Sequence, residues 1–269
     1  MGISVLMSVY KKENPIYFEE ALRSVIGQSH QPDEIVIIKD GELTDELENV
    51  IENAKESFSG IVTFQFKENV QLGRALAKGL ELCKNELIAR MDTDDIACPD
   101  RFATQYQYMI THTEAAVCGG WMEEFNDEGT FLKVKKVPID KKEILQYAKY
   151  RNPINHMTVM FRKSVIMKAG NYQHFPYMED YYLWSRVAAN GNELHNLPVV
   201  FVRARVSDNV YNRRGGWKLF KQHYQFRKEQ RRLGLLKIME YPIAIALSFG
   251  ITIIPSDLRR LVYQKILRR

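Results

Sequence analysis

The stretch that decides the fold is Leu87-Ile88-Ala89-Arg90-Met91-Asp92-Thr93-Asp94-Asp95. An apolar run of strand length ends there in three carboxylates within four positions. In an open parallel sheet, ligands bind beyond the carboxyl ends of the strands. The stretch therefore predicts a buried strand that carries an acidic turn into a ligand site.

Apolar runs of strand length also occur upstream, at residues 3–10, 35–38 and 62–66, and each is followed by a segment of helical period. Asn14 and Pro15 form a typical helix start, a capping residue followed by proline at the first helical position. Such alternation predicts a Rossmann-like α/β fold, with a mostly parallel central sheet and flanking helices.

The pattern becomes mixed after Pro99. We expect a hairpin around residues 126–129 and helices that end at Gly170 and Gly191, where glycine supplies the left-handed conformation. The other expected elements are helices at 102–110, 164–169, 181–189 and 217–233 and strands at 116–118 and 199–206.

The composition fits one catalytic domain with an appendage. The chain has 269 residues, of which 45% are hydrophobic and 26% charged, enough for one large core or two small ones. Its three cysteines lack C-x-x-C spacing and a histidine at zinc-ligand distance, which argues against a disulfide framework and a zinc site. Residues 2–10 lack the basic start and cleavage site of a signal peptide, so we expect a cytoplasmic protein.

Basic charge is concentrated near the end of the chain. Residues 203–269 hold 16 Lys and Arg against 4 Asp and Glu, a net charge of +12, whereas residues 1–202 hold 22 against 29, a net charge of −7. Residues 241–256 carry no charge, but crossing a bilayer takes about 20 apolar residues, so this stretch is expected to lie in the interface or re-enter it shallowly. We expect residues 211–269 to be a basic, helical extension that associates with the anionic inner face of the cell membrane.

The acidic turn has a chemical explanation. Asp92, Asp94 and Asp95 would repel one another unless a cation or well-placed donors lay among them. Mg²⁺ or Mn²⁺ held by one or two carboxylates usually completes its shell with water and substrate phosphates. The turn therefore favours a divalent cation with a diphosphate partner, and a solvated acidic loop is the alternative.

Five blocks of the sequence together resemble family 2 of the inverting glycosyltransferases, which have the GT-A fold. The resemblance matches in order and spacing over roughly residues 1–210, which it implies are the catalytic domain. The blocks are residues 4–10 with 21–29, Asp40-Gly41, Gly73-Arg74-Ala75, Asp92-Thr93-Asp94-Asp95 and Glu179-Asp180.

The resemblance implies a donor site for a nucleotide diphosphate sugar, most simply a UDP-hexose. The residues that it places there are Ser8 and Tyr10 in the nucleotide pocket, Asp40 at the base, Arg74 at the diphosphate or base, and Asp92 or Asp94 at the ribose. Asp94 or Asp95 would hold the Mn²⁺ or Mg²⁺ ion that bridges the phosphates, and which aspartate does which stays open.

The same resemblance implies that Asp180 is the catalytic base. Inverting transfer needs a group that takes the proton of the attacking sugar hydroxyl, and a positioned carboxylate can do so. Glu179 would orient the acceptor or its loop. The alternative for Asp180 is a carboxylate that interacts with the dipole of a helix N-terminus.

Four further residues are candidates for acceptor or auxiliary roles. His156 lies in a block before the acceptor site and could contact a phosphate, or it could be a structural histidine. Trp184 could form the floor of the acceptor-sugar site, or it could pack in the core. Arg213 and Arg214 lie where the family has a basic, glycine-containing loop near the donor diphosphate, and a solvated turn is their alternative.

The expected function is transfer of galactose, glucose or N-acetylglucosamine from a UDP-sugar to a glycan on undecaprenyl diphosphate, in bacterial surface polysaccharide synthesis. A dTDP-rhamnose donor is the alternative within the family. A dinucleotide-binding enzyme is disfavoured, because G-x-G-x-x-G and P-loop motifs are absent from the sequence. A nucleic-acid-binding protein would leave the acidic residues 1–202 unused, so no nucleic-acid partner is expected, and a non-catalytic protein that binds a nucleotide sugar is the last alternative.

Overall fold

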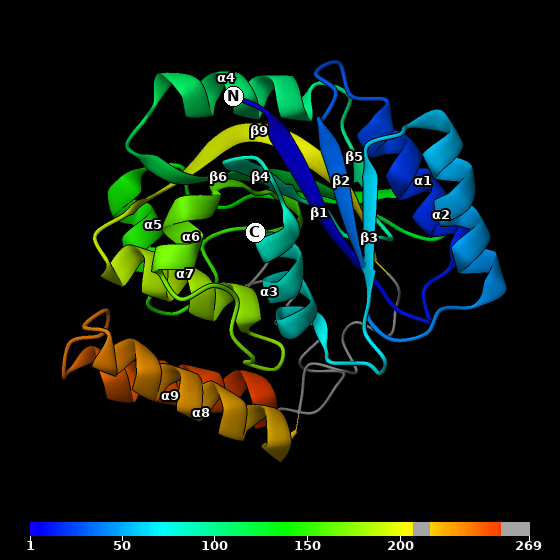
Figure 1. Cartoon of the computed structure of the whole chain (residues 1–269). Helices are drawn as coiled ribbons and strands as arrows, with labels where there is room; N and C mark the ends of the chain where they lie inside the picture. Colours follow the sequence, from blue (N-terminus) through cyan, green and yellow to red (C-terminus); the bar gives the residue numbers. More distant parts are fainter. Residues whose placement is uncertain (207–215, 254–269) are drawn as a thin grey trace.

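The computed structural model describes residues 1–206 and 216–253 and arranges them as one sheet with helices on both faces and a helical pair beside it (Figure 1). The strands are β1 (Ile3–Val9), β2 (Glu34–Lys39), β3 (Ile61–Gln65), β4 (Leu87–Arg90), β5 (Ile96–Ala97), β6 (Ala115–Phe125), β7 (Phe131–Lys135), β8 (Met160–Arg162) and β9 (Glu193–Arg205). The helices are α1 (Pro15–Ile26), α2 (Asp45–Ser57), α3 (Leu72–Leu82), α4 (Arg101–Thr111), α5 (Lys141–Tyr147), α6 (Lys163–Lys168), α7 (Glu179–Ala189), α8 (Trp217–Arg232) and α9 (Glu240–Ile253), with a 3₁₀ turn at His156–Thr158.

The sheet is parallel in its first half and mixed in its second. Its order is β3-β2-β1-β4-β8-β6-β9-β5, with β7 paired to β6. β1 pairs in parallel with β2 and β4, and β2 pairs in parallel with β3, whereas β8 runs antiparallel to β4 and β6. The predicted α/β sheet with flanking helices is therefore confirmed, including the change of pattern after Pro99.

The first crossover helix begins where the sequence predicts it. The side chain of Asn14 accepts a hydrogen bond of 2.9 Å from the Ile16 N–H, and Pro15 occupies the first turn, where its missing N–H costs nothing. Thr44 caps α2 in the same way through the N–H of Leu47. These caps fix where the chain leaves the carboxyl ends of β1 and β2, which are the ends that carry the site.

Two apolar cores cover the two faces of the sheet. Alternate residues of β1 point to opposite faces, so that Val5 and Met7 join the core under α1, α2 and α4, while Leu6 joins the core under α3, α6 and α7. Gly79 of α3 permits close packing, because a Cβ there would lie 2.3 Å from a methyl group of Leu6. A sheet buried on both faces leaves the strand ends as the place for polar chemistry.

Two strands are longer than predicted. The expected strand at 116–118 extends to Phe125, because Gly119 and Gly120 continue β6 instead of ending it. Added Cβ atoms at these glycines would lie 2.6 Å from the Asn196 side chain and 2.4 Å from Phe201, so close packing against β9 requires glycine at both positions. β9 likewise starts at Glu193 rather than at residue 199, and its pairing with β6 is irregular.

The C-terminal part described by the structure is a pair of helices. α8 agrees with the predicted helix at 217–233, and α9 covers most of the uncharged stretch at residues 241–256.

The helix ends predicted at two glycines are also present. Gly170 and Gly191 follow α6 and α7 and have φ values of +89° and +80°, in the left-handed region. Within residues 1–206 and 216–253, no helix has the length and apolarity needed to cross a membrane. Arg213, Arg214 and the basic residues 257–269 lie outside the described residues.

Candidate active site

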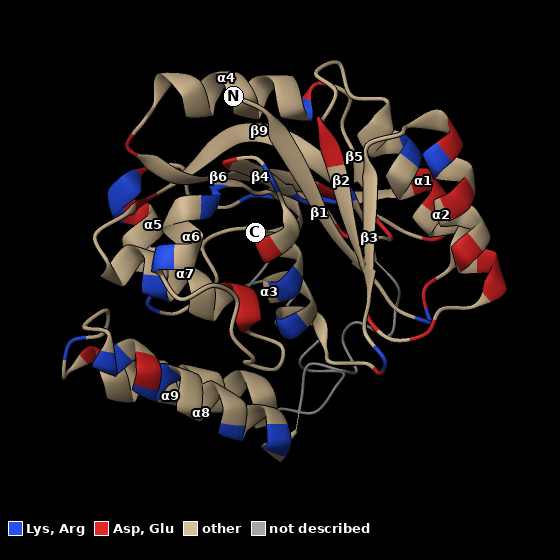
Figure 2. Cartoon of the chain, in the orientation of Figure 1, with Lys and Arg blue, Asp and Glu red and all other residues tan. Residues whose placement is uncertain are grey.

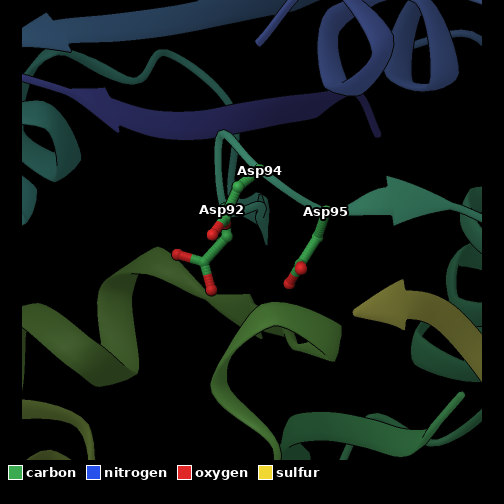
Figure 3. A group of neighbouring side chains, drawn as sticks. All are labelled: Asp92, Asp94 and Asp95. Atoms are coloured by element: carbon green, nitrogen blue, oxygen red, sulfur yellow. The ribbon is translucent and has the colours of Figure 1, made fainter. Parts of the chain in front are cut away.

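The acidic turn leaves the carboxyl end of β4, next to the end of β1. The N–H of Met91 still donates to the Leu6 carbonyl at 3.1 Å, and the chain then turns away from the sheet. One carboxylate oxygen from each of Asp92, Asp94 and Asp95 lies within 4.8 Å of the others. Figure 3 shows all three side chains leaving the turn toward the same side. The predicted convergence of the three aspartates is therefore present.

The electrostatics of the turn resist three negative charges. Burial, and then the charges of Asp92 and Glu13, raise the pKa of Asp94 to about 7. Burial and the two neighbouring aspartates also raise the pKa of Asp95, although its carboxylate accepts a hydrogen bond of 2.9 Å from the Arg205 N–H. Oxygen ligands that repel one another within reach of a single ion fit a divalent cation such as Mg²⁺ or Mn²⁺.

Arg90 supplies a positive charge that the sequence did not predict. Its side chain is 2% exposed and forms an ion pair with Asp92. Its Nε and Nη1 atoms have no hydrogen-bond partner among the residues that the structure describes. The only sequence signal is one charged residue within the otherwise apolar run of residues 87–91, which by itself does not predict an ion pair.

The donor-side residues surround the ends of β1 and β2. Asp40 is 5% exposed; its two carboxylate oxygens accept from the Val70 N–H at 2.6 Å and from the Asn69 side chain at 3.0 Å. Burial raises the pKa of Asp40 despite these bonds. Asp40 thus holds the loop that leads into α3. Ser8 is half-buried, Tyr10 is 40% exposed, and Arg74 is exposed in the first turn of α3.

Glu179 and Asp180 form the first turn of α7. Asp180 accepts a hydrogen bond of 2.5 Å from Nδ2 of Asn152, a residue in the loop before β8. Burial raises the pKa of Asp180, while hydrogen bonds from the Tyr181 backbone and from the Asn152 side chain oppose the rise by favouring the charged form. Burial, followed by the charge of Asp180, raises the pKa of Glu179 to about 7.

The Glu179–Asp180 pair and the acidic turn interact electrostatically. The charge of Asp92 contributes to the raised pKa of Glu179, and the charge of Arg90, the ion-pair partner of Asp92, acts to lower the pKa of both Glu179 and Asp180. The start of α3 is close as well, because a Cβ added to Gly73 would lie 3.3 Å from the Cβ of Glu179. Three blocks that are distant in the sequence, namely the acidic turn, the start of α3 and the start of α7, thus lie at one site.

The structure distinguishes the two aromatic candidates. His156 donates or accepts a 2.9 Å hydrogen bond between its Nε2 and the Tyr172 hydroxyl, and burial and Arg90 lower its pKa, so the ring is neutral at pH 7. Trp184 is completely buried and packs near Phe161, with ring centroids 6.3 Å apart. A sugar needs an exposed ring face, so the core-packing alternative describes Trp184.

The chain belongs to glycosyl transferase family 2. The family model matches residues 4–169, which include the acidic turn and end before Glu179. The chain is therefore an enzyme that transfers sugars.

Two relatives make the comparison more specific. The chain is 40% identical to the amylovoran biosynthesis glycosyltransferase AmsE of Erwinia amylovora over 82% of this chain and 83% of that protein. It is 35% identical to the UDP-Gal:alpha-D-GlcNAc-diphosphoundecaprenol beta-1,3-galactosyltransferase of Escherichia coli, over 99% of this chain and 96% of that protein.

Solved structures agree with the GT-A fold. Residues 1–349 of TarS of Staphylococcus aureus, in complex with UDP-GlcNAc, superpose with a TM-score of 0.72 and 16% identity, covering 99% of this chain and 76% of that one. A mannosyltransferase of Pyrobaculum calidifontis, in complex with GDP-Man and Mn²⁺, gives a TM-score of 0.64 and 13% identity, covering 98% of this chain and 79% of that one.

Proposed function

We propose that the chain is an inverting hexosyltransferase that moves galactose, glucose or N-acetylglucosamine from a UDP-sugar to a glycan on undecaprenyl diphosphate, in surface polysaccharide synthesis. The observation that carries the proposal is the convergence of two carboxylate groups. The Asp92–Asp95 turn after β4 and the Glu179–Asp180 pair of α7 lie close enough for Asp92 to affect the pKa of Glu179.

The donor half of the proposal rests on the ends of β1, β2 and β4. Asp94 and Asp95 are the carboxylates that would hold Mn²⁺ or Mg²⁺, since Asp92 already has Arg90 as a partner. A bound ion would act as a Lewis acid that stabilises negative charge on the departing nucleotide. Ser8, Tyr10 and Asp40 would line the nucleoside, and Arg74 would approach the diphosphate.

The acceptor half rests on α7. Asp180 is the proposed base, because it is a partly exposed carboxylate at a helix start with a neutral amide, Asn152, holding one oxygen. The Asp180 carboxylate takes the proton of the attacking sugar hydroxyl as the bond to the anomeric carbon forms on the face opposite the diphosphate. Glu179 would orient the acceptor, and His156 offers a neutral ring beside Tyr172.

The relatives support the choice of substrates. The Escherichia coli relative is named for a UDP-Gal donor and a diphosphoundecaprenol acceptor, and it matches nearly the full length of both chains. The TarS structure holds UDP-GlcNAc, which supports UDP as the nucleotide. Separate reactions with different sugar donors distinguish the hexoses.

A transfer assay tests the proposal. The purified chain is incubated with Mn²⁺, a GlcNAc-diphosphate-lipid acceptor and, in separate reactions, UDP-galactose, UDP-glucose, UDP-GlcNAc and dTDP-rhamnose. We expect acceptor-dependent release of UDP and a product larger by one hexose, both abolished by EDTA and restored by Mn²⁺. Turnover with dTDP-rhamnose alone would move the chain to the alternative donor, and donor binding without turnover on any acceptor would support a non-catalytic protein.

A further inference from the structure

The α9 helix has an exposed apolar face that a water-soluble domain does not require. No charged residue follows Glu240 in this helix. Ala244, Ser248 and Thr252 form the buried stripe toward α8, and large apolar side chains occupy the opposite side. The exposed ones are Ile243 (52%), Leu247 (49%), Phe249 (45%) and Ile253 (39%). Contiguous exposed apolar surface of this kind marks an interaction site.

Aromatic rings extend this surface onto α8. The Trp217 and Phe220 rings lie 5.2 Å apart, and the Phe220 ring lies 5.2 Å from that of Phe249 on α9. A groove of about 480 Å³ runs along this face of α8; its lining residues are Trp217, Phe220, Lys221, Tyr224, Gln225 and Lys228. The two helices therefore share one aromatic and apolar surface.

Basic residues border the groove. Lys218, Lys221 and Lys228 are exposed, and Arg231 and Arg232 follow them in the last turn of α8. Figure 2 shows basic segments along α8 from end to end. Aromatic and aliphatic side chains beside a row of lysines are typical of helices that lie in the plane of a membrane interface.

The opposite face of α8 is fixed to the catalytic domain. Arg227 is 3% exposed and donates to the carbonyl oxygens of Lys149 at 2.9 Å and Tyr150 at 2.8 Å, and to the Tyr181 hydroxyl at 3.2 Å. Gln230 donates to the Ala148 carbonyl at 2.8 Å. Tyr181 follows Asp180 directly, so these contacts connect the helical pair to the helix that carries the proposed base.

A second set of contacts holds both helices of the pair, through Glu240 of α9 and Phe226 of α8. Lys149 and Glu240 form an ion pair of 2.7 Å in which both side chains are largely shielded from solvent. Phe226 packs on Tyr181 with ring centroids 4.4 Å apart and is completely buried. Buried arginine bonds and close ring packing favour a fixed orientation of the pair relative to α7.

We propose that the α8–α9 pair is a docking platform for anionic phospholipid bilayers, and that its Arg227 and Gln230 anchor holds Asp180 at a fixed position relative to the membrane surface. This inference rests on the proposed function, because a lipid-linked acceptor carries its reacting sugar at that surface. A nucleic acid would use the lysines but not the uncharged face of α9. An anionic bilayer would contact both the lysines of α8 and the uncharged face of α9.

Vesicle binding tests the platform. The full chain is sedimented with vesicles of phosphatidylcholine and phosphatidylglycerol in equal amounts, and with phosphatidylcholine alone. We expect binding only to the anionic vesicles. Each lysine near an anionic surface contributes about fivefold, so Lys221→Glu with Lys228→Glu should weaken binding by more than tenfold. Leu247→Glu should also weaken it more than tenfold. The matched controls Lys84→Glu with Lys142→Glu, and Ile110→Glu, change exposed residues outside the pair and should bind as the wild type does.

Two acceptors separate this inference from the proposed function. One carries the diphosphate-linked sugar on a short water-soluble alkyl chain, and the other carries it on a polyprenyl chain in the anionic vesicles. Leu247→Glu should lose more than tenfold in rate on the vesicle acceptor and keep the wild-type rate on the soluble one. Unchanged vesicle binding and vesicle activity in these variants would overturn the platform while leaving transfer intact.

The remaining outcomes are also decisive. If no protein transfers sugar to either acceptor, the proposed function fails, and vesicle sedimentation still decides the platform. If the wild type is a dimer in sedimentation velocity, Leu247→Glu makes it monomeric and vesicle binding is unaffected, then the apolar face pairs with a second copy and the membrane assignment is wrong.

Discussion

The two carboxylate groups of the site differ in what balances their charge. In the turn after β4, Asp92 has the guanidinium of Arg90, and Asp94 and Asp95 repel each other and Asp92. At the start of α7, Asp180 accepts a hydrogen bond from a neutral group, the side-chain amide of Asn152. Carboxylates that are short of positive charge bind cations, whereas a carboxylate held by an amide remains free to accept a proton. The environment of each carboxylate, not the residue type, therefore favours cation binding at the turn after β4 and proton transfer at the start of α7.

Replacing one carboxylate of each group is the strongest test of whether the two groups differ in role. Asp180→Asn removes the proposed base while keeping the shape of the side chain, so kcat should fall by about 10²–10⁴ while the affinity for the UDP-sugar stays within twofold of the wild type. Asp94→Asn should instead weaken the Mn²⁺-dependent rise in thermal stability that the donor produces. Steady-state rates and thermal shifts with and without Mn²⁺ measure both. If Asp180→Asn keeps its turnover, Asp180 is not the base.

Arg90 offers the next largest effect. Arg90→Met keeps an unbranched, largely apolar side chain but leaves Asp92 without its partner, and breaking one side of a buried ion pair costs about 3 kcal/mol. We expect that loss in urea unfolding in EDTA. Adding Asp92→Asn should recover most of the stability, because both charges are then absent. Arg23→Met, at an exposed pair with Glu19, is the matched control and should cost under about 1 kcal/mol. No recovery in the double variant would mean that Arg90 acts through packing.

The sequence predicts the donor half of the fold well because its signals are local. The apolar runs, the Asn14 cap and the acidic turn after β4 are each read within about ten residues, and the parallel sheet brings their ends together. The Asp180 assignment needed the family resemblance, since a carboxylate at a helix start is common in proteins.

The second half depends on contacts that no local pattern contains. Asn152 reaches Asp180 across 28 positions, and Gly119 and Gly120 continue β6 because β9 packs closely against them. Helical periodicity places Trp184 on an apolar face but does not say whether that face is open to a substrate. The role of Arg90, in the first half, was missed for another reason: its ion pair joins residues only two positions apart, but the sequence does not show that its side chain is buried beside Asp92.

The charge of Glu179 at the start of α7 can be tested through the pH dependence of the protein's stability. Its pKa is raised from 4.5 to about 7, so the folded chain binds this proton more tightly than the unfolded chain does. The contribution of Glu179 to stability is therefore fully present below about pH 4.5 and is lost as the pH rises through 7. Glu179→Gln should stabilise the protein by about 2 kcal/mol at pH 8 and leave it unchanged at pH 4. Urea unfolding at the two pH values measures this, and Glu56→Gln, on the exposed face of α2, is the control. An equal gain at both pH values would contradict the charge explanation.

Asn152 gives the smallest and most specific test. Its Nδ2 donates to Asp180 at 2.5 Å and favours the charged carboxylate, so Asn152→Ala should raise the pKa of Asp180. The acid limb of the kcat/KM profile should then move upward by about one pH unit, with the alkaline rate retained. Asn49→Ala, on the exposed side of α2, should leave the profile unchanged. A rate that falls equally at every pH would show that Asn152 holds the loop before β8, and that the amide does not set the proton affinity of the base.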